Sequence, residues 1–118
     1  DFPDRRSVTY SFRIRCDQSP KDAGGRKALI ADLNPIFEKI PQSYSEPFKL
    51  TVTKKLMNRN SANHNERGQN ILFLIGDVEF TKQRTIGISK DDIFTLKGTN
   101  VYKGSELPSC TSDAFLAP

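Results

Sequence analysis

Few side chains in this 118-residue sequence are of the types that support acid–base chemistry. The one histidine, His64, lies in the asparagine-rich stretch 58–70, close to Glu66 and Arg67. General acid–base catalysis requires two groups held in opposite protonation states, so His64 with Glu66 and Arg67 is the strongest local candidate. The other carboxylates considered are Glu46, Asp91 and Asp92. No spacing pairs any of them with His64, and the plainer interpretation of each is a solvated loop position.

Other catalytic chemistries have less support. A single histidine and two widely spaced cysteines provide no ligand cluster for a metal ion. His64 has no G-x-S-x-G elbow beside it, so nucleophilic catalysis by serine is not predicted. Gly24 and Gly25 lack the rest of a phosphate-binding loop or a dinucleotide fingerprint. We therefore predict no metal and no cofactor.

Basic residues provide a different candidate site. The formal net charge of +4 favours anionic partners such as RNA. If two of the predicted strands are neighbours, cations on their polar faces could follow a phosphate backbone, and an exposed tyrosine could stack on a base. The predicted binding set is Arg13, Arg15, Lys49, Lys55 and Tyr44, with Tyr102 as a second stacking candidate. The plainer alternative is an ordinary solvated sheet face.

The first element that would position these residues is a strand. Residues 8–16 alternate between apolar and polar side chains, which is typical of a half-buried strand. The side chains predicted to face the core are Val8, Tyr10, Phe12, Ile14 and Cys16. Arg13 and Arg15 then project from the polar face.

The remaining elements are predicted from periodicity and from turn residues. Residues 29–40 carry apolar side chains at helical spacing, interrupted where a second short helix can begin with Asn34 as its N-cap and Pro35 as its first residue. Strands are expected at 48–53, 71–75, 78–80, 84–89 and 93–97, with a hairpin turn at Gly76 and Asp77 and an exposed loop at 58–70. The strand at 71–75 is continuously apolar and is expected to be central.

This order of elements predicts the α+β class. One helical region packs on a four- to five-stranded antiparallel sheet. The chain is expected to form one domain over residues 1–118, with a structured core at 7–110 and a frayed tail at 111–118. No apolar run is long enough to span a bilayer, so no membrane contact is predicted.

Two cysteines, Cys16 and Cys110, bracket most of the predicted elements. One interpretation is a single disulfide, which would restrict an unfolded chain of this loop length by about 4–5 kcal/mol. Such a bond persists in oxidising compartments and therefore indicates secretion. A start at Asp1 without an initiator Met is in keeping with a processed secreted chain. The alternative is two unrelated buried thiols in a cytosolic protein.

The overall layout resembles the small secreted fungal ribonucleases and, more closely, the ribonuclease-like effectors of powdery mildew fungi. The segments that carry the resemblance are 10–16, the helical region 29–40, 43–48, 67–73, 85–89 and the closing Cys110. The resemblance implies a ribonuclease-like fold in which the first and last cysteines are paired. One departure is that Ile14-Arg15-Cys16 stands where these proteins carry Tyr-x-Cys.

The resemblance also implies a function. The ribonucleases cleave RNA with a histidine and a glutamate as base, an arginine on the phosphate and a second histidine as acid. A chain with one histidine cannot use that mechanism. We therefore expect a pseudoenzyme: a secreted, monomeric virulence effector of a fungal plant pathogen, delivered into host cells. Its expected partners are host RNA or a host protein, plant immune receptors included.

Two alternatives remain open at this point. The first is an active secreted ribonuclease with a non-standard site built from Glu46, His64, Arg67 and Arg84. The second is a bacterial assembly subunit of α+β fold in which the cysteines are incidental.

Overall fold

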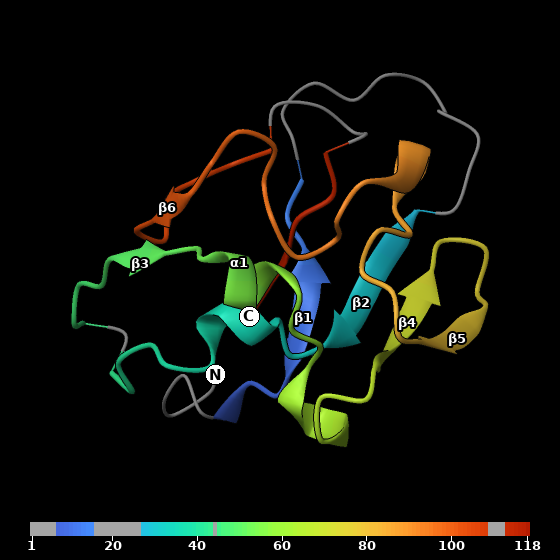
Figure 1. Ribbon diagram of the computed structural model, residues 1–118, viewed down its shortest axis with the longest axis horizontal. Coiled ribbons are helices and arrows are strands. Elements are labelled where there is room, and N and C mark those ends of the chain that lie inside the picture. The colour runs from blue at the N-terminus through green and yellow to red at the C-terminus, as the bar shows by residue number, and fades with distance from the viewer. Residues whose placement is uncertain (1–6, 16–26, 44, 109–112) are drawn as a thin grey trace.

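Figure 1 shows a five-stranded sheet on one side of the molecule and a two-stranded sheet on the other. The computed structural model describes residues 7–15, 27–43, 45–108 and 113–118. The predicted disulfide between Cys16 and Cys110 and the predicted stacking residue Tyr44 lie outside the described residues.

The larger sheet combines strands from both ends and from the middle of the chain. Its strands are β1 (Tyr10–Arg13), β2 (Ala28–Asp32), β4 (Gln69–Phe73), β5 (Val78–Thr81) and β7 (Leu116–Ala117). They lie in the order β5-β4-β2-β1-β7, and each neighbouring pair is antiparallel. The edges of the sheet are therefore β5 and β7.

The remaining elements are short. The second sheet pairs β3 (Leu50–Thr51) with β6 (Val101–Tyr102). The helical turns are η2 (Pro35–Phe37), α1 (Lys54–Met57), η3 (Ala62–His64) and η4 (Ile88–Lys90). Among the described residues no helix has both the length and the apolar character to cross a membrane. The predicted α+β class with an antiparallel sheet is confirmed at this coarse level.

The helical prediction for residues 29–40 is wrong over its first half, whereas its second half contains the 3-10 helix η2. Its first half forms β2, which pairs with β1 on one side and with β4 on the other. The apolar run Ala28–Ala31 suits an interior strand, because two ladders of hydrogen bonds outweigh a local helical spacing. The predicted cap is confirmed, since Oδ1 of Asn34 accepts a hydrogen bond of 3.0 Å from the backbone N–H of Ile36. Pro35 is the first residue of η2.

The alternation predicted for residues 8–16 continues through β1, but its orientation is wrong. Ser11 is fully buried, whereas Tyr10 and Phe12 are 53% and 46% exposed. The Ser11 hydroxyl accepts a hydrogen bond of 2.8 Å from the backbone N–H of Asn34. A hydroxyl with a hydrogen-bond partner costs little to bury, so hydropathy alone assigned the inward face to the wrong residues.

The core lies on the Ser11 side of the sheet and has two clusters. The first includes Ile71 of β4 and Leu116 of β7, and the second is aromatic and includes Tyr102 and Phe115. Both clusters thus contain a residue from the C-terminal segment. The frayed tail predicted for residues 111–118 is wrong for residues 113–116, all of which are buried.

The strands predicted for residues 84–89 and 93–97 do not form. This part of the chain contains η4 and otherwise irregular backbone. Some backbone N–H groups here donate to side-chain oxygens instead of to the carbonyls of a neighbouring strand. Oδ1 of Asp92, for example, accepts from the backbone N–H of Phe94 at 3.0 Å. Oδ2 of Asp91 accepts from the backbone N–H of Ala114 at 2.5 Å. Local side-chain bonds of this kind compete with sheet formation.

Candidate functional site

His64 ends η3 beside the larger sheet and contacts a buried carboxylate. Its Nε2 lies 2.9 Å from Oδ2 of Asp32, the last residue of β2. The Asp32 side chain is 5% exposed, whereas that of His64 is 40% exposed. The His64 ring also meets Phe80 edge to face, with ring centroids 5.5 Å apart. The structure therefore pairs His64 with a carboxylate that the sequence analysis missed.

Asp32 is fixed by its neighbours. The backbone N–H of Asn70 donates to Oδ2 at 2.7 Å, and the side-chain amide of Asn63 donates to Oδ1 at 3.3 Å. A carboxylate held in this way orients an imidazole. The same Nε2 of His64 also lies 2.9 Å from the side-chain amide nitrogen of Asn70. The pair supplies one half of an acid–base site, because cleavage also needs a proton donor for the leaving group.

The other residues predicted to act with His64, either locally or in the catalytic alternative, lie in different surroundings. Glu66 accepts a hydrogen bond of 2.6 Å from Nε of Arg59. Arg67 is exposed, and its backbone N–H donates to the carbonyl of His64 at 3.1 Å. Glu46 lines a pocket to which His64 does not contribute. Arg67 therefore contacts His64 through the backbone, and Glu46 lies elsewhere.

Arg84 is buried, at 6% exposure. Its Nε and Nη2 donate to the two carboxylate oxygens of Asp92, at 3.2 and 2.9 Å. Its Nη1 donates to the carbonyls of Leu56 and Arg59, the latter at 2.9 Å. The guanidinium also lies 5.4 Å from the centroid of the Phe94 ring. These contacts direct Arg84 toward protein groups rather than toward His64.

The arrangement expected to bring the basic residues together is wrong. β1, which carries Arg13, pairs with β2 and β7, whereas Lys49 precedes β3 in the other sheet. Arg13 is half-buried, and its Nη1 donates to the carbonyl of Ala28 at 3.3 Å. The exposed members are Arg15, Lys49 and Lys55. Tyr102 is fully buried, and its hydroxyl accepts from the backbone N–H of Leu96, so it is not a stacking residue.

The sheet face opposite the core carries a continuous line of apolar side chains. Phe12 of β1 pairs with Ala117 of β7 and with Ile30 of β2. Ile30 in turn pairs with Leu72 of β4, and Leu72 pairs with Val78 of β5. Because paired residues share a face, these five side chains cross all five strands. We call them the apolar row. Ala117, at the β7 edge, also packs against the aromatic core cluster.

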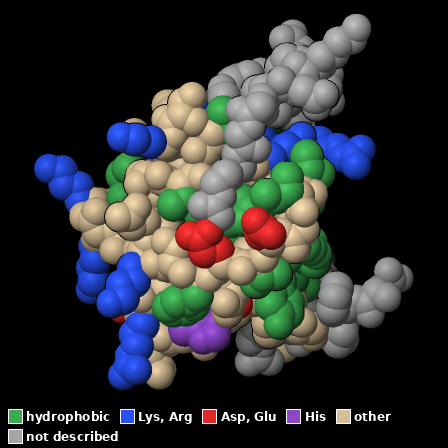
Figure 2. Space-filling model, turned by 90° about the vertical axis from the view of Figure 1, so that its right-hand side faces the viewer, with side chains coloured by type: hydrophobic (Ala, Val, Ile, Leu, Met, Phe, Trp, Pro, Cys, Tyr) green, Lys and Arg blue, Asp and Glu red, His purple; other side chains and the backbone are tan. Residues whose placement is uncertain are grey.

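Much of the apolar row and its surroundings is accessible to solvent. Phe12 is 46%, Phe80 48% and Val78 67% exposed, and the β4–β5 turn adds Leu74 and Ile75. Figure 2, seen from the side on which the β4–β5 hairpin lies, shows hydrophobic side chains with acidic ones among them and the histidine near the lower edge. Lys and Arg side chains lie mainly along the left-hand border. The open face is defined here as the apolar row with Tyr10, His64 and Phe80.

The sequence contains part of the signal for the open face. Val78 and Phe80 flank Glu79 at period two, as Tyr10 and Phe12 flank Ser11. This period shows that each pair shares a face, but not which face the core covers. No sequence pattern indicates that Asp32 contacts His64, because Asp32 follows an apolar run that is far from His64 in sequence.

Comparison of the chain with protein-family models, with curated proteins and with solved structures found no match.

Proposed function

We propose that this chain is a secreted fungal effector that binds a host protein through the open face. Its ribonuclease-like scaffold has no ribonuclease activity in this proposal. The observation that carries it is the apolar row, which crosses all five strands of the sheet. Single apolar side chains on a surface are ordinary, whereas contiguous apolar patches on soluble domains mark interaction sites.

A protein partner suits the chemistry of the open face better than RNA does. Ile30, Leu72 and Val78 are aliphatic and offer no ring on which a base could stack. Against an apolar protein surface they contribute about 25 cal/mol for each Å² buried. Tyr10 and Phe12 add aromatic side chains, and tyrosine is a type that often dominates binding energy at protein interfaces.

A binding experiment tests the protein partner. Immobilised wild-type chain is compared with Val78→Asp and with the control Thr51→Asp, an exposed position on β3 of the other sheet. Each is incubated with host plant extract, with and without added ribonuclease, and the eluates are quantified by mass spectrometry. We expect Val78→Asp alone to lose a defined protein. Equal recovery by both variants, or recovery that ribonuclease abolishes, contradicts the proposal.

The absence of catalysis is tested separately. His64 and Asp32 form one oriented acid–base pair, and a general acid for the leaving group is a further requirement. We therefore expect no RNA turnover in a sensitive cleavage assay. Turnover that disappears in both His64→Ala and Asp32→Asn would instead support the active ribonuclease.

Secretion and the ribonuclease-like scaffold rest on the resemblance and on the two cysteines. In this proposal Cys16 and Cys110 form one disulfide. Intact-mass analysis of the native chain is then expected to find two hydrogens fewer than in the reduced chain. Two free thiols would favour the bacterial assembly subunit.

Single-stranded RNA is the second candidate partner. The observation that favours it is the placement of exposed Tyr10 and Phe80 on the same face as His64, in a chain of net charge +4. Aromatic rings on an open sheet stack on unpaired bases. RNA affinity would then fall by about 0.7 log units per log unit of salt for each phosphate contacted. Tyr10→Ala would weaken binding, whereas affinity that is insensitive to both changes excludes this candidate.

A further inference from the structure

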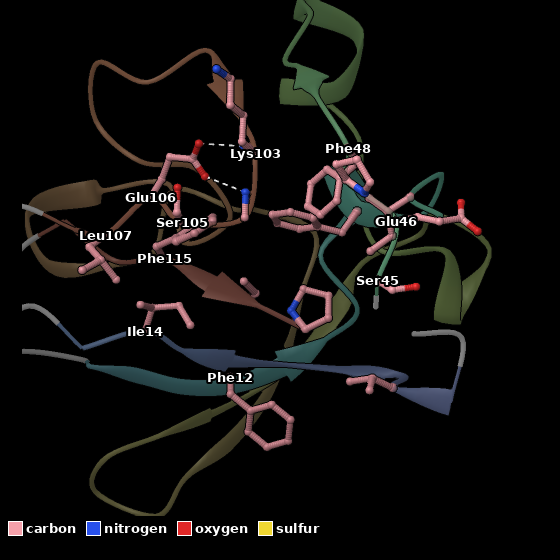
Figure 3. Close-up of a pocket in the computed structure, with 17 residues that line it drawn as sticks. Phe12, Ile14, Ser45, Glu46, Phe48, Lys103, Ser105, Glu106, Leu107 and Phe115 are labelled. Carbon is pink, nitrogen blue, oxygen red and sulfur yellow. Dashed lines mark hydrogen bonds between the residues drawn. The ribbon is translucent and has the colours of Figure 1, made fainter. Parts of the chain in front are cut away.

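A pocket lies between strand β1, the edge strand β7 and the loop that follows β6. Its volume is about 720 Å³, within the range of natural small-molecule sites. Figure 3 shows its lining side chains, which come from the segments around β1, η2 and β7 and from the loops before β3 and after β6. Phe12 lies at its border and points to the other side of the sheet.

The floor of the pocket is the aromatic core cluster. Phe37 and Phe115 are 7% and 4% exposed, and their ring centroids are 6.0 Å apart. Phe48 meets Phe37 edge to face at 6.4 Å. Ile14 and Ile40 line the pocket and are only half-buried. An apolar molecule placed here would cover these half-exposed side chains and extend the core outward, which is favourable in proportion to the area covered.

The charged side chains at the pocket are directed elsewhere. Glu106 is held by its own loop, since its two carboxylate oxygens accept from the backbone N–H groups of Lys103 at 2.6 Å and Gly104 at 2.9 Å. Burial raises the pKa of Glu106, but these hydrogen bonds outweigh burial and lower it below its ordinary value. The ammonium group of Lys103 and the carboxylate of Glu46 point away from the aromatic rings (Figure 3).

We propose that this pocket binds an uncharged, apolar small molecule. The rings of Phe37, Phe48 and Phe115 provide an apolar lining, and the ammonium group of Lys103 at the rim is turned away from them. A charged ligand would lose its hydration there without gaining a counter-charge, which is costly. An uncharged, apolar ligand loses little favourable hydration and gains free energy from the burial of its apolar surface.

Two fluorescent probes with the same ring body test this site. N-phenyl-1-naphthylamine is uncharged, and 1-anilinonaphthalene-8-sulfonate adds one negative charge. We expect the uncharged probe to bind the full-length chain saturably at one site per molecule, and the sulfonate to bind there at least about tenfold more weakly. No saturable binding of the uncharged probe, or equal affinity for the two probes at this site, overturns the proposal.

Variants then locate the probe. Ser45→Trp and Ser105→Trp place a large side chain at opposite exposed rims of the pocket. Thr51→Trp is the matched control on β3, and Val78→Lys disrupts the apolar row instead. We expect each rim variant to weaken binding at least about tenfold, with both controls unchanged. Unchanged affinity in both rim variants, or an equal loss in Val78→Lys, overturns the assignment to this pocket.

Discussion

The side chain of Asn34 is fully buried and bonded to distant parts of the chain. Its Nδ2 donates to the carbonyls of Phe94 at 2.8 Å and Leu116 at 2.7 Å, and its Oδ1 accepts from the backbone N–H of Ile36. The amide is therefore used as both donor and acceptor. Asn34 therefore joins the end of β2 to η2, to the irregular segment 84–97 and to β7.

Replacing Asn34 tests this role. Asn34→Asp keeps the shape of the side chain but turns oxygen toward the carbonyls of Phe94 and Leu116, where a donor is required. We expect it to lower the free energy of unfolding by about 3–5 kcal/mol, because a buried charge is left without a partner. Asn34→Ala is expected to cost about 2–3 kcal/mol, through the carbonyls left unsatisfied. Urea unfolding measures both, and an aspartate variant as stable as the alanine variant would contradict this account.

Asp91 has a pH-dependent effect that can be isolated. Burial raises the pKa of its carboxyl above the ordinary 3.8, outweighing the hydrogen bond from Ala114 and the charge of Lys97. Between 3.8 and the raised pKa, the folded chain retains a proton that the unfolded chain has lost. The contribution of Asp91 to stability therefore falls as pH rises through this window.

Asp91→Asn removes this titration while keeping an oxygen that can accept from the backbone N–H of Ala114. We expect the stability of the variant relative to wild type to increase as pH rises from below 3.8 to neutrality. Urea unfolding of both chains at a series of pH values measures the difference. A difference that does not change with pH would show that Asp91 is not the group responsible.

At the scale of elements, the β4–β5 hairpin depends on one close approach. A Cβ added at Gly68 would lie 2.5 Å from the carbonyl oxygen of Thr81 and 2.8 Å from Cζ of Phe80. We expect Gly68→Ala to cost about 2–3 kcal/mol, because backbone at the end of β5 must move. Gly98→Ala is the control: its φ is also positive, at 71°, but nothing lies within 4 Å of its added Cβ. It is expected to cost about 1 kcal/mol.

Urea unfolding compares the two glycine variants. The NMR shift of the His64 ring reports separately on Phe80, which packs against it. Gly68→Ala should move this resonance and Gly98→Ala should not. Equal costs for the two variants would mean that β5 adjusts freely.

The elements that the sequence predicts are those whose conformation depends on neighbouring residues. The β4–β5 hairpin and the cap at Asn34 depend on neighbouring residues, and both were predicted. The residues of β2 carry a helical spacing in sequence, and this spacing predicts a helix. They form a strand because β1 and β4, which are distant in sequence, pair with them. The inward face of β1 was misassigned because Ser11 is satisfied by Asn34, a contact that hydropathy does not reveal.

The same reasoning applies to the candidate sites. The sequence names His64 as the strongest candidate for acid–base chemistry, but its neighbour Asp32 is brought to it only by the sheet. The basic residues are not brought together on one sheet face, because β1 and β3 belong to different sheets. The apolar row depends on the register of four strand pairings, and no single stretch of sequence encodes it.

At the scale of the whole molecule, the C-terminal segment closes the fold. β7 adds the last strand beside β1, and the backbone N–H of Leu116 donates to the carbonyl of Ile93 at 2.8 Å. The ring of Phe115 stacks on Tyr102, with centroids 5.5 Å apart. The segment therefore joins the large sheet, the irregular region and the small sheet, and we infer that these parts unfold together.

Removing residues 113–118 tests this inference. The deletion uncovers both core clusters and leaves the edge of β1 unpaired, so we expect the shortened chain to lose its cooperative urea transition. Phe115→Ala alone is expected to cost about 3–5 kcal/mol, as for other buried phenylalanines. Removal of Pro118 alone, which is exposed, should change stability by less than about 0.5 kcal/mol. Losing a required strand would remove most of the total stability of a small domain. A shortened chain that still unfolds cooperatively, with a stability within about 1 kcal/mol of wild type, would therefore show that the rest of the sheet is stable without β7.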